Sequence, residues 1–482
     1  MAPSKRAPAA LLALGLALVG CGAPEPARAP VLLLCVDGLE PELVQRFLAA
    51  GSLPTLARFA AQGTLGSLET QLPTWSPVLW TTIATGQGLR EHGVVGFLEP
   101  TTGLPYTSNA RRVPALWNLV GDAGLEVDTV GYWVTWPAEQ VSGRMVASYA
   151  AQAQAQVIWK PGMWRSLARQ THPEELLEEI APLITFTDQA EQIRAPLEAL
   201  TGLSEPPAPE EEKLLIDLAW TLMGDRSYAG IAERFLRQDP ADLTIVYLSL
   251  PDVAGHRFWR YLFPEQMGYP VAERDLQRFG GVIERAYAET DRQLGRLLDA
   301  APPEANVLLV SDHGMHRDIE TLGDPSALTS GHHQTGPSGL FGALGPAFAA
   351  RGPCFEAANP RGLLGDIRGV APLVLRLCGL PTPEHWPFAR PGNPLEELLA
   401  PAFAAARPRR FRTSPDEAWR LEHPPSLPLD PGPAMNAGFL EAFTQLGYIN
   451  REQPPPRPQT PGEPAHPDPA GPPQQDPGGP PR

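Results

Sequence analysis

Basic residues are scarce in this 482-residue chain, and cysteines are scarcer still. Its 38 Lys and Arg residues are outnumbered by 54 Asp and Glu residues, which gives a formal net charge of -16. Non-specific nucleic-acid binding needs clustered basic side chains for its phosphate contacts, so the composition excludes that class of protein. Four scattered cysteines cannot supply the disulfide framework of so long a chain. The chain is long enough to bury a large core with an insertion, or to form two domains.

The N-terminus lacks an apolar run long enough to cross a bilayer. The run from Leu11 to Val19 falls well short of the roughly twenty residues that a membrane span needs. Lys5 and Arg6 precede it and Cys21 follows it, a pattern that resembles a bacterial lipoprotein signal. We expect residues 1–20 to be cleaved and Cys21 to carry lipid, followed by a tether over residues 21–29. The alternative is an ordinary secretory signal with a chance cysteine.

Lipidation would attach the exported protein to a membrane that faces the periplasm or the cell exterior, and Gly22 favours the outer membrane. At the other end, residues 451–482 contain 13 prolines and no aromatic, Val, Ile or Leu residue. Such a segment cannot bury enough apolar surface to fold, so we expect it to be disordered.

Between these ends, apolar runs of strand length alternate with amphipathic helical patterns, which indicates an α/β fold. The strand-like runs are 31–36, 127–133, 243–250 and 306–310, and the helical patterns that follow the first strand are 40–49 and 54–62. Continuous apolar strands are typical of a buried parallel sheet. Residues 98–240 are less regular, with a helical run over 211–237, and we interpret them as an inserted cap. The catalytic core would then comprise residues 30–97 and 241–450.

Three of the predicted strands are each followed by an aspartate. Asp37 follows the first of these strands, Asp252 the next and Asp312 the last. Taken singly, Asp37 before a glycine is typical of a turn, and Asp252 is typical of a helix start. Ligands of open α/β sheets gather beyond the carboxyl ends of the strands, so the three together indicate a site.

Histidines accompany these aspartates. His256 lies four residues after Asp252, so one helical turn would place both on one face, and His313 is adjacent to Asp312. A later Gly-rich loop adds the pair His332-His333, and only one of these two need be a ligand. Six N and O ligands without cysteine suit two divalent ions, each with an open position. Zinc suits three histidines, while the carboxylates also suit Mn²⁺ or Mg²⁺.

Ser76-Pro77 opens an apolar, helix-like run over residues 78–84. One interpretation is structural, with Ser76 as the N-cap and Pro77 at the first helical position. The other is catalytic, because helix amides and the helix dipole stabilise an anion at that place. The local pattern suits both.

Together these motifs resemble the alkaline phosphatase superfamily, and within it the type I phosphodiesterase and nucleotide pyrophosphatase branch, over about residues 30–97 and 242–380. The resemblance implies a mostly parallel sheet flanked by helices, with an inserted cap. It also implies that Ser76 is a nucleophile that forms a phosphoseryl intermediate. By motif match one metal ion would be held by Asp37, Ser76, Asp312 and His313, and the other by Asp252, His256 and His333.

The activity implied is hydrolysis of phosphate mono- or diesters. Leu79 stands where nucleotide-cleaving members carry an asparagine, so the resemblance does not extend to a nucleotide substrate. Sulfatases need a C/S-x-P-x-R motif, which Ser76-Pro77-Val78 does not begin. The alternatives are a sulfatase, a phosphomutase or headgroup transferase using the same metals, and a metal-retaining lipoprotein that only binds a partner.

The same resemblance implies structural roles for two further segments. His92 belongs to a stretch after the nucleophile helix, and residues 369–381 resemble the family's closing helix. The aromatic residues of the insert could stack on a base, but we expect them to form its own core; they are Tyr132, Trp133, Trp136, Trp159 and Trp164.

Overall fold

The computed structural model describes residues 28–100, 102–148, 150, 168–185, 190–203, 209–354, 363–390, 392–413 and 419. The predicted signal peptide, Cys21, the Pro-rich tail and two of the insert tryptophans, Trp159 and Trp164, lie outside these residues. Among the helices that are described, none combines the length and the apolar character of a membrane span. Export and lipid attachment therefore stay predictions.

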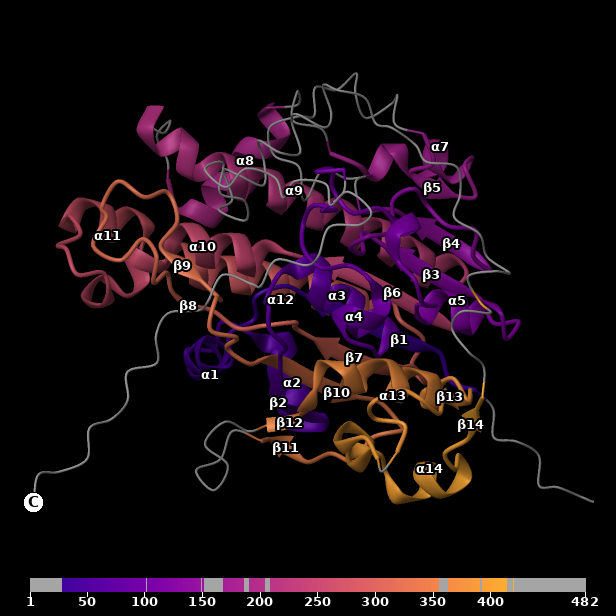
Figure 1. The fold of residues 1–482 in the computed structure, drawn as a ribbon. Coiled ribbons are helices and arrows are strands. Elements are labelled where there is room, and N and C mark those ends of the chain that lie inside the picture. The colour runs from indigo at the N-terminus through magenta and orange to yellow at the C-terminus, as the bar shows by residue number, and fades with distance from the viewer. Residues whose placement is uncertain are drawn as a thin grey trace, which may run out of the picture.

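A ten-stranded sheet forms the centre of the molecule (Figure 1). Its order is β11-β2-β10-β7-β1-β6-β3-β4-β5, with β12 also paired to β2. Most neighbours are parallel; β10 is antiparallel to β2 and β7, and β5 to β4. The strands are β1 (Val31–Val36), β2 (Thr64–Glu69), β3 (Val127–Val130), β4 (Gly143–Val146), β5 (Thr171–His172), β6 (Leu243–Leu248), β7 (Asn306–Val310), β10 (Gly339–Leu344), β11 (Gly352–Pro353) and β12 (Leu363–Asp366). The α/β class and the mostly parallel sheet are as the sequence predicts.

Two small two-stranded sheets lie apart from the central sheet, β8 (His316–Arg317) with β9 (Gly331–His332) and β13 (Thr382–Pro383) with β14 (Phe411–Arg412). The helices are α1 (Pro41–Ala49), α2 (Pro54–Gln62), α3 (Ser76–Thr85), α4 (Leu89–His92), α5 (Leu116–Gly121), α7 (Leu176–Ile180), α8 (Ala190–Thr201), α9 (Pro209–Gln238), α10 (Leu250–Leu262), α11 (Glu273–Phe279), α12 (Val282–Ala300), α13 (Val370–Leu377) and α14 (Pro401–Ala406). Helices α9, α10 and α12 pack together, and α3 packs against α13 and α4 (Figure 1).

Strands β1, β6 and β7 are buried along their whole length. Leu33 of β1 lies opposite Ile245 of β6 on one side and Leu308 of β7 on the other. Strands covered on both faces need apolar residues at every position, which explains the unbroken apolar runs of the sequence. Because β1 lies between β6 and β7, the carboxyl ends of these three strands meet.

The range predicted to be a separate cap contributes to this sheet. Strands β3, β4 and β5 all fall between residues 98 and 240, and β3 pairs in parallel with β6. Helix α9, from the same range, packs against β6 and β3. The range predicted as an insert thus includes strands of the central sheet, of which the sequence indicated only the run at 127–133.

Candidate metal centre

The predicted ligands come together at the carboxyl ends of β1, β6 and β7. Asp37 follows β1 directly, Asp252 lies in the first turn of α10 after β6, and Asp312 and His313 follow β7. His333 reaches the same place from the loop after β9. All of these side chains and His256 are buried, with at most 2 % of each residue exposed.

There are two groups of candidate ligands, Asp37 with Asp312 and His313, and Asp252 with His313 and His333; within each group the ligand atoms lie within 4.8 Å of one another. Nε2 of His313 lies 3.3 Å from Oδ1 of Asp37 and 3.5 Å from Oδ2 of Asp312. Oδ1 of Asp252 lies 3.9 Å from Nε2 of His333. The rings of His313 and His333 stack with centroids 3.7 Å apart, so His313 lies between the two groups.

His256 joins the second group through Asp252. Its Nε2 lies 3.4 Å from Oδ1 of Asp252, one helical turn away, as the spacing predicts. His332, by contrast, is only half-buried, and its Nδ1 accepts a hydrogen bond from the backbone N–H of His333. Of the two adjacent histidines, the structure brings His333 into the cluster.

The tautomers of two histidines follow from their backbone contacts. Nδ1 of His256 lies 2.8 Å from the carbonyl of Gly331, and Nδ1 of His313 lies 2.9 Å from that of Gly314. A carbonyl only accepts, so both Nδ1 atoms carry a proton, which leaves Nε2 as the nitrogen of each ring that can bind a metal ion. Burial lowers the pKa of His256 to about 4, which keeps its ring neutral. A neutral His256 whose Nε2 faces Oδ1 of Asp252 at 3.4 Å favours a cation between the two atoms.

Buried polar atoms without a hydrogen-bond partner converge here within the described part of the chain. They are Oδ1 of Asp37, both carboxylate oxygens of Asp312, Nε2 of His313 and both ring nitrogens of His333. Burial, with the nearby charges of Asp37 and Asp252, raises the pKa of Asp312. Uncompensated buried charge of this kind is unfavourable unless cations neutralise it. The donor set therefore fits divalent metal ions.

Ser76 begins α3, whose N-cap is Trp75, with no side-chain capping bond. The structural interpretation placed Ser76 itself at the N-cap; the helix starts one residue earlier than that, and its proline occupies the second position. Two contacts tie this segment to the cluster. Thr74 donates its hydroxyl to the carbonyl of His333 at 2.8 Å, and the indole of Trp80 donates to Oδ2 of Asp37 at 2.9 Å.

Comparison with known proteins assigns the chain to a family. The family profile described as type I phosphodiesterase / nucleotide pyrophosphatase matches residues 31–318, more than half of the chain. The chain belongs to this family. It is thus a member of the alkaline phosphatase superfamily, as its motifs predict. None of the curated proteins compared with this phosphodiesterase-family chain matches it.

Solved structures similar to this family member include phosphonoacetate hydrolase from Sinorhizobium meliloti 1021, in complexes with phosphonoformate and with phosphonoacetate. Each is 18 % identical with a TM-score of 0.37, and the match covers 61 % of this chain and 58 % of the hydrolase. A 2-O GAG sulfatase is 12 % identical with a TM-score of 0.46, over 80 % of this chain and 76 % of the sulfatase. The chain thus spans less than two thirds of the hydrolase.

Two residues singled out by the family motifs are structural. The backbone N–H of Val94 donates to Nδ1 of His92, so Nε2–H of His92 donates to Thr82. Burial, followed by the charge of Arg111, lowers the pKa of His92 to about 3. Leu79 is fully buried in the apolar core, so its side chain cannot hold a phosphate oxygen.

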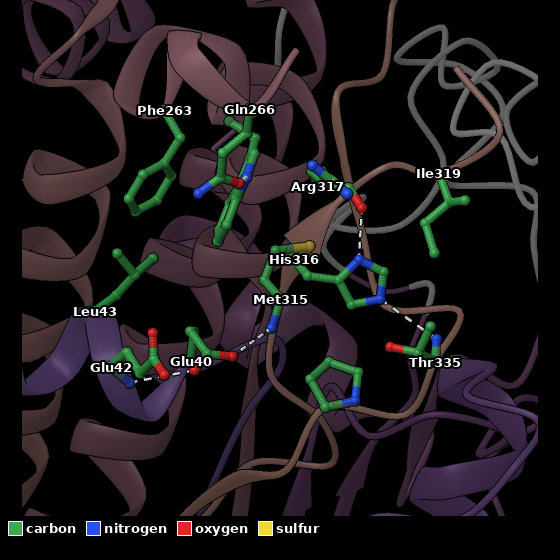
Figure 2. A pocket seen from close by; sticks show the side chains of 12 residues that line it. Glu40, Glu42, Leu43, Phe263, Gln266, Met315, His316, Arg317, Ile319 and Thr335 are labelled. Carbon is green, nitrogen blue, oxygen red and sulfur yellow. Dashed lines mark hydrogen bonds between the residues drawn. The ribbon is translucent and has the colours of Figure 1, made fainter. Parts of the chain in front are cut away.

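A pocket of about 560 Å³ is lined by residues of α1, of α10 and of the segments after β7 and β9 (Figure 2). Its wall includes residues that follow three ligand motifs, Glu40, Met315 and Thr335. Figure 2 shows the Glu40 side chain pointing at Met315, whose backbone N–H it accepts at 2.8 Å. Burial raises the pKa of Glu40 to about 7. Glu40 thus joins the loop after β1 to the loop after β7, a role that no sequence motif indicated.

Helix α9 holds the start of α10, the helix that carries two candidate ligands. The carboxylate of Asp225 accepts the backbone N–H groups of Ser249 at 3.0 Å and Leu250 at 2.8 Å. Seven residues after Leu250, Arg257 forms a fully buried ion pair with Asp217 of α9. The range predicted to be an inserted cap therefore also holds the helix that carries two candidate ligands.

Proposed function

We propose that the chain hydrolyses phosphate esters at this cluster, with Ser76 as nucleophile and two divalent ions as cofactors. One observation carries the proposal. Six buried side chains from four separate segments converge, and α3, which begins at Ser76, is bonded to one of them, Asp37. The family assignment supports phosphate-ester chemistry in general.

The residues divide between the two ions by motif and by distance. Asp37, Asp312 and His313, with Ser76, would hold one ion, and Asp252, His256 and His333 the other. Ions bound there would stabilise negative charge on the phosphoryl oxygens and lower the pKa of the groups that they contact. Zinc, manganese and magnesium all suit these ligands, with three histidines favouring zinc.

The chain's own part is nucleophilic catalysis. The Ser76 hydroxyl gives up its proton and its Oγ attacks phosphorus; the bond from phosphorus to the ester oxygen breaks, the alcohol leaves with a proton, and a phosphoserine remains. Water then attacks the same phosphorus, phosphate departs and Ser76 is regenerated. The backbone amides at the start of α3 favour the negative charge that both steps bring to this place.

The decisive experiment combines metal analysis with a substrate panel of phosphomonoesters, phosphodiesters, phosphonates and sulfate esters. We expect two divalent ions per chain and turnover of a phosphate ester. Turnover of sulfate esters alone would assign a sulfatase instead. Two bound ions with no turnover would favour a protein that retains metal to bind a partner, and group transfer without hydrolysis would favour a mutase or headgroup transferase.

Replacing the nucleophile tests the mechanism directly. Ser76→Ala should lower turnover of an aryl phosphate by at least about a thousandfold, because the covalent route is lost, while most of the bound metal persists. Ser108→Ala is the matched control, a buried serine that donates to the carbonyl of Pro137 elsewhere. Acid-quenched wild-type protein should carry phosphate on Ser76 by mass spectrometry. Undiminished turnover in Ser76→Ala would sink the assignment.

A further inference from the structure

Aromatic hydrogen-bond donors hold the Asp37 carboxylate. Its Oδ2 accepts from the Tyr247 hydroxyl at 2.5 Å and from Nε1 of Trp80 at 2.9 Å. Its Oδ1 has no hydrogen-bond partner and lies 3.3 Å from Nε2 of His313. The two oxygens of Asp37 therefore have different roles, one bonded to the scaffold and the other facing the cluster.

The direction of each hydrogen bond in this set is fixed by chemistry. The Tyr247 hydroxyl donates to Oδ2 of Asp37, which accepts. An indole N–H only donates, so Nε1 of Trp133 donates to the Tyr247 oxygen, at 2.9 Å. A chain of donors thus runs from Trp133, just after β3, through Tyr247 of β6 to Asp37 after β1, and Trp80 joins it from α3.

Packing holds these side chains in place. The rings of Trp80 and Tyr247 meet edge to face with centroids 5.2 Å apart, and those of Trp133 and Tyr247 do so at 6.5 Å. The Tyr132 hydroxyl donates to the carbonyl of Trp80 at 2.7 Å. Trp80, Tyr247 and Trp133 are at most 6 % exposed, so water has little access to replace any of these donors.

We infer that Tyr247 and Trp80 are positioning residues for the ion that Asp37 binds, with Trp133 holding Tyr247 in turn. The inference rests on the proposed two-ion site. With Oδ2 occupied by two donors, Asp37 presents Oδ1 alone, as a single oxygen aimed at the side of the cluster where Asp312 and His313 lie. Hydrogen-bonded supports of this kind orient metal ligands before the ion arrives.

Because Tyr247 and Trp80 bond to Asp37, removing one of these donors should affect the binding of the two ions unequally. Tyr247→Phe keeps the ring and removes the donor, so the ion held by Asp37, Asp312 and His313 should bind about 10- to 100-fold more weakly. The ion held by Asp252, His256 and His333 should keep its affinity. At saturating metal, turnover should recover, because Tyr247 does not touch the reacting atoms.

The test is a calorimetric titration of the metal-free full chain with Zn²⁺, together with turnover measured against zinc concentration. Tyr228→Phe is the matched control, since this fully buried tyrosine donates at 2.6 Å to the carbonyl of Ser148. It should lose comparable thermal stability and bind both ions as the wild type does. Trp80→Phe is the second variant, which removes the other donor to Asp37 and serves if Tyr247→Phe does not fold.

Weaker binding of one ion in Tyr247→Phe or Trp80→Phe, with both ions tight in Tyr228→Phe, is the expected result. Unchanged affinity for both ions, or equal weakening of both, would overturn the inference. The wild-type titration separates this from the proposed function. Two ions without turnover of any phosphate ester would refute hydrolysis and leave the positioning result standing, whereas fewer than two ions would refute both.

Discussion

His256 and His313 each donate one ring N–H to a backbone carbonyl, of Gly331 and Gly314 respectively. Neither bond depends on a bound ion, so the nitrogen that would meet the metal is already selected in the folded chain. Because of this preorganisation, the two histidines would not need to reorient when an ion binds.

The two adjacent histidines give a residue-scale prediction. His333→Ala should remove a buried ligand, lower the metal content by about one ion and reduce turnover about a hundredfold or more. His332→Ala should keep both ions and lose less than about tenfold in turnover, since its hydrogen bond with His333 is to the backbone N–H. Metal analysis of the two variants side by side decides, and a greater loss of metal in His332→Ala would reverse the assignment.

Sequence motifs predicted the residues that converge on the cluster, because strand ends and the spacing of Asp252 and His256 carry that information locally. They did not predict Trp80 and Tyr247. These partners of Asp37 lie 43 and 210 positions from it, in apolar stretches that are indistinguishable from ordinary core. Their polar atoms acquire a role only when the fold brings three elements together. The insert aromatics Tyr132, Trp133 and Trp136 were predicted to form the insert's own core; they are buried instead in the core around the central sheet, where Tyr132 and Trp133 pack against Tyr247 of β6.

At the scale of elements, unbroken apolar runs were the most informative signal. Residues 31–36 and 306–310 form strands with the predicted bounds. The helices predicted over 40–49 and 54–62 are also present, with bounds within one residue of the prediction. The run at 127–133 ends early at Val130, because Gly131 turns the chain with a φ of 74°. Strand β2 was missed, since a glycine and a serine interrupt its apolar pattern.

Helix α10 supplies the element-scale prediction through Asp225. Burial raises the pKa of this carboxyl from an ordinary 3.8 to about 7, so the folded state binds its proton more tightly than the unfolded state does. This contribution to stability is complete below about pH 4 and is lost as pH rises through about 7. The free energy of unfolding should therefore fall with rising pH in this window, by up to about 1.4 kcal/mol per pH unit from this group.

Asp225→Asn removes that titration and keeps an oxygen acceptor. Between pH 4.5 and 7.5 the wild type should lose stability relative to the variant, measured by denaturant unfolding of the metal-free proteins across pH. Glu179→Gln serves as a control, because this carboxylate is half exposed in its ion pair with Arg234. Parallel pH profiles for wild type and Asp225→Asn would contradict the prediction.

For the whole molecule, the buried carboxylates of the cluster lower the stability of the metal-free fold. Three carboxylates lie together with buried histidines, and burial with the neighbouring aspartates raises the pKa of Asp312. Such an arrangement is stable when cations are present and serves function at the expense of the metal-free fold. Ion binding and folding should therefore be coupled throughout the molecule.

Removing the ions should lower the melting temperature of the wild type. At a concentration a hundred times its Kd, each ion contributes about 2.7 kcal/mol to the free energy of unfolding, which a chelator removes. Asp312→Asn should respond less to the chelator, and in its presence should melt at or above the wild-type temperature, because one buried carboxyl is gone. Differential scanning calorimetry with and without EDTA makes the comparison; a chelator-insensitive wild type would contradict it.

The bonds between α9 and α10 limit how far the chain could be trimmed to a minimal enzyme. A deletion of residues 98–240 would look attractive, since it spares every ligand motif. It would also remove Asp225 and Asp217, the anchors of the ligand-bearing helix, along with Trp133 and the strand that pairs with β6. A shortened version that keeps a competent site must retain α9 and β3, so loop grafting aimed at new substrates is better confined to the segments between them.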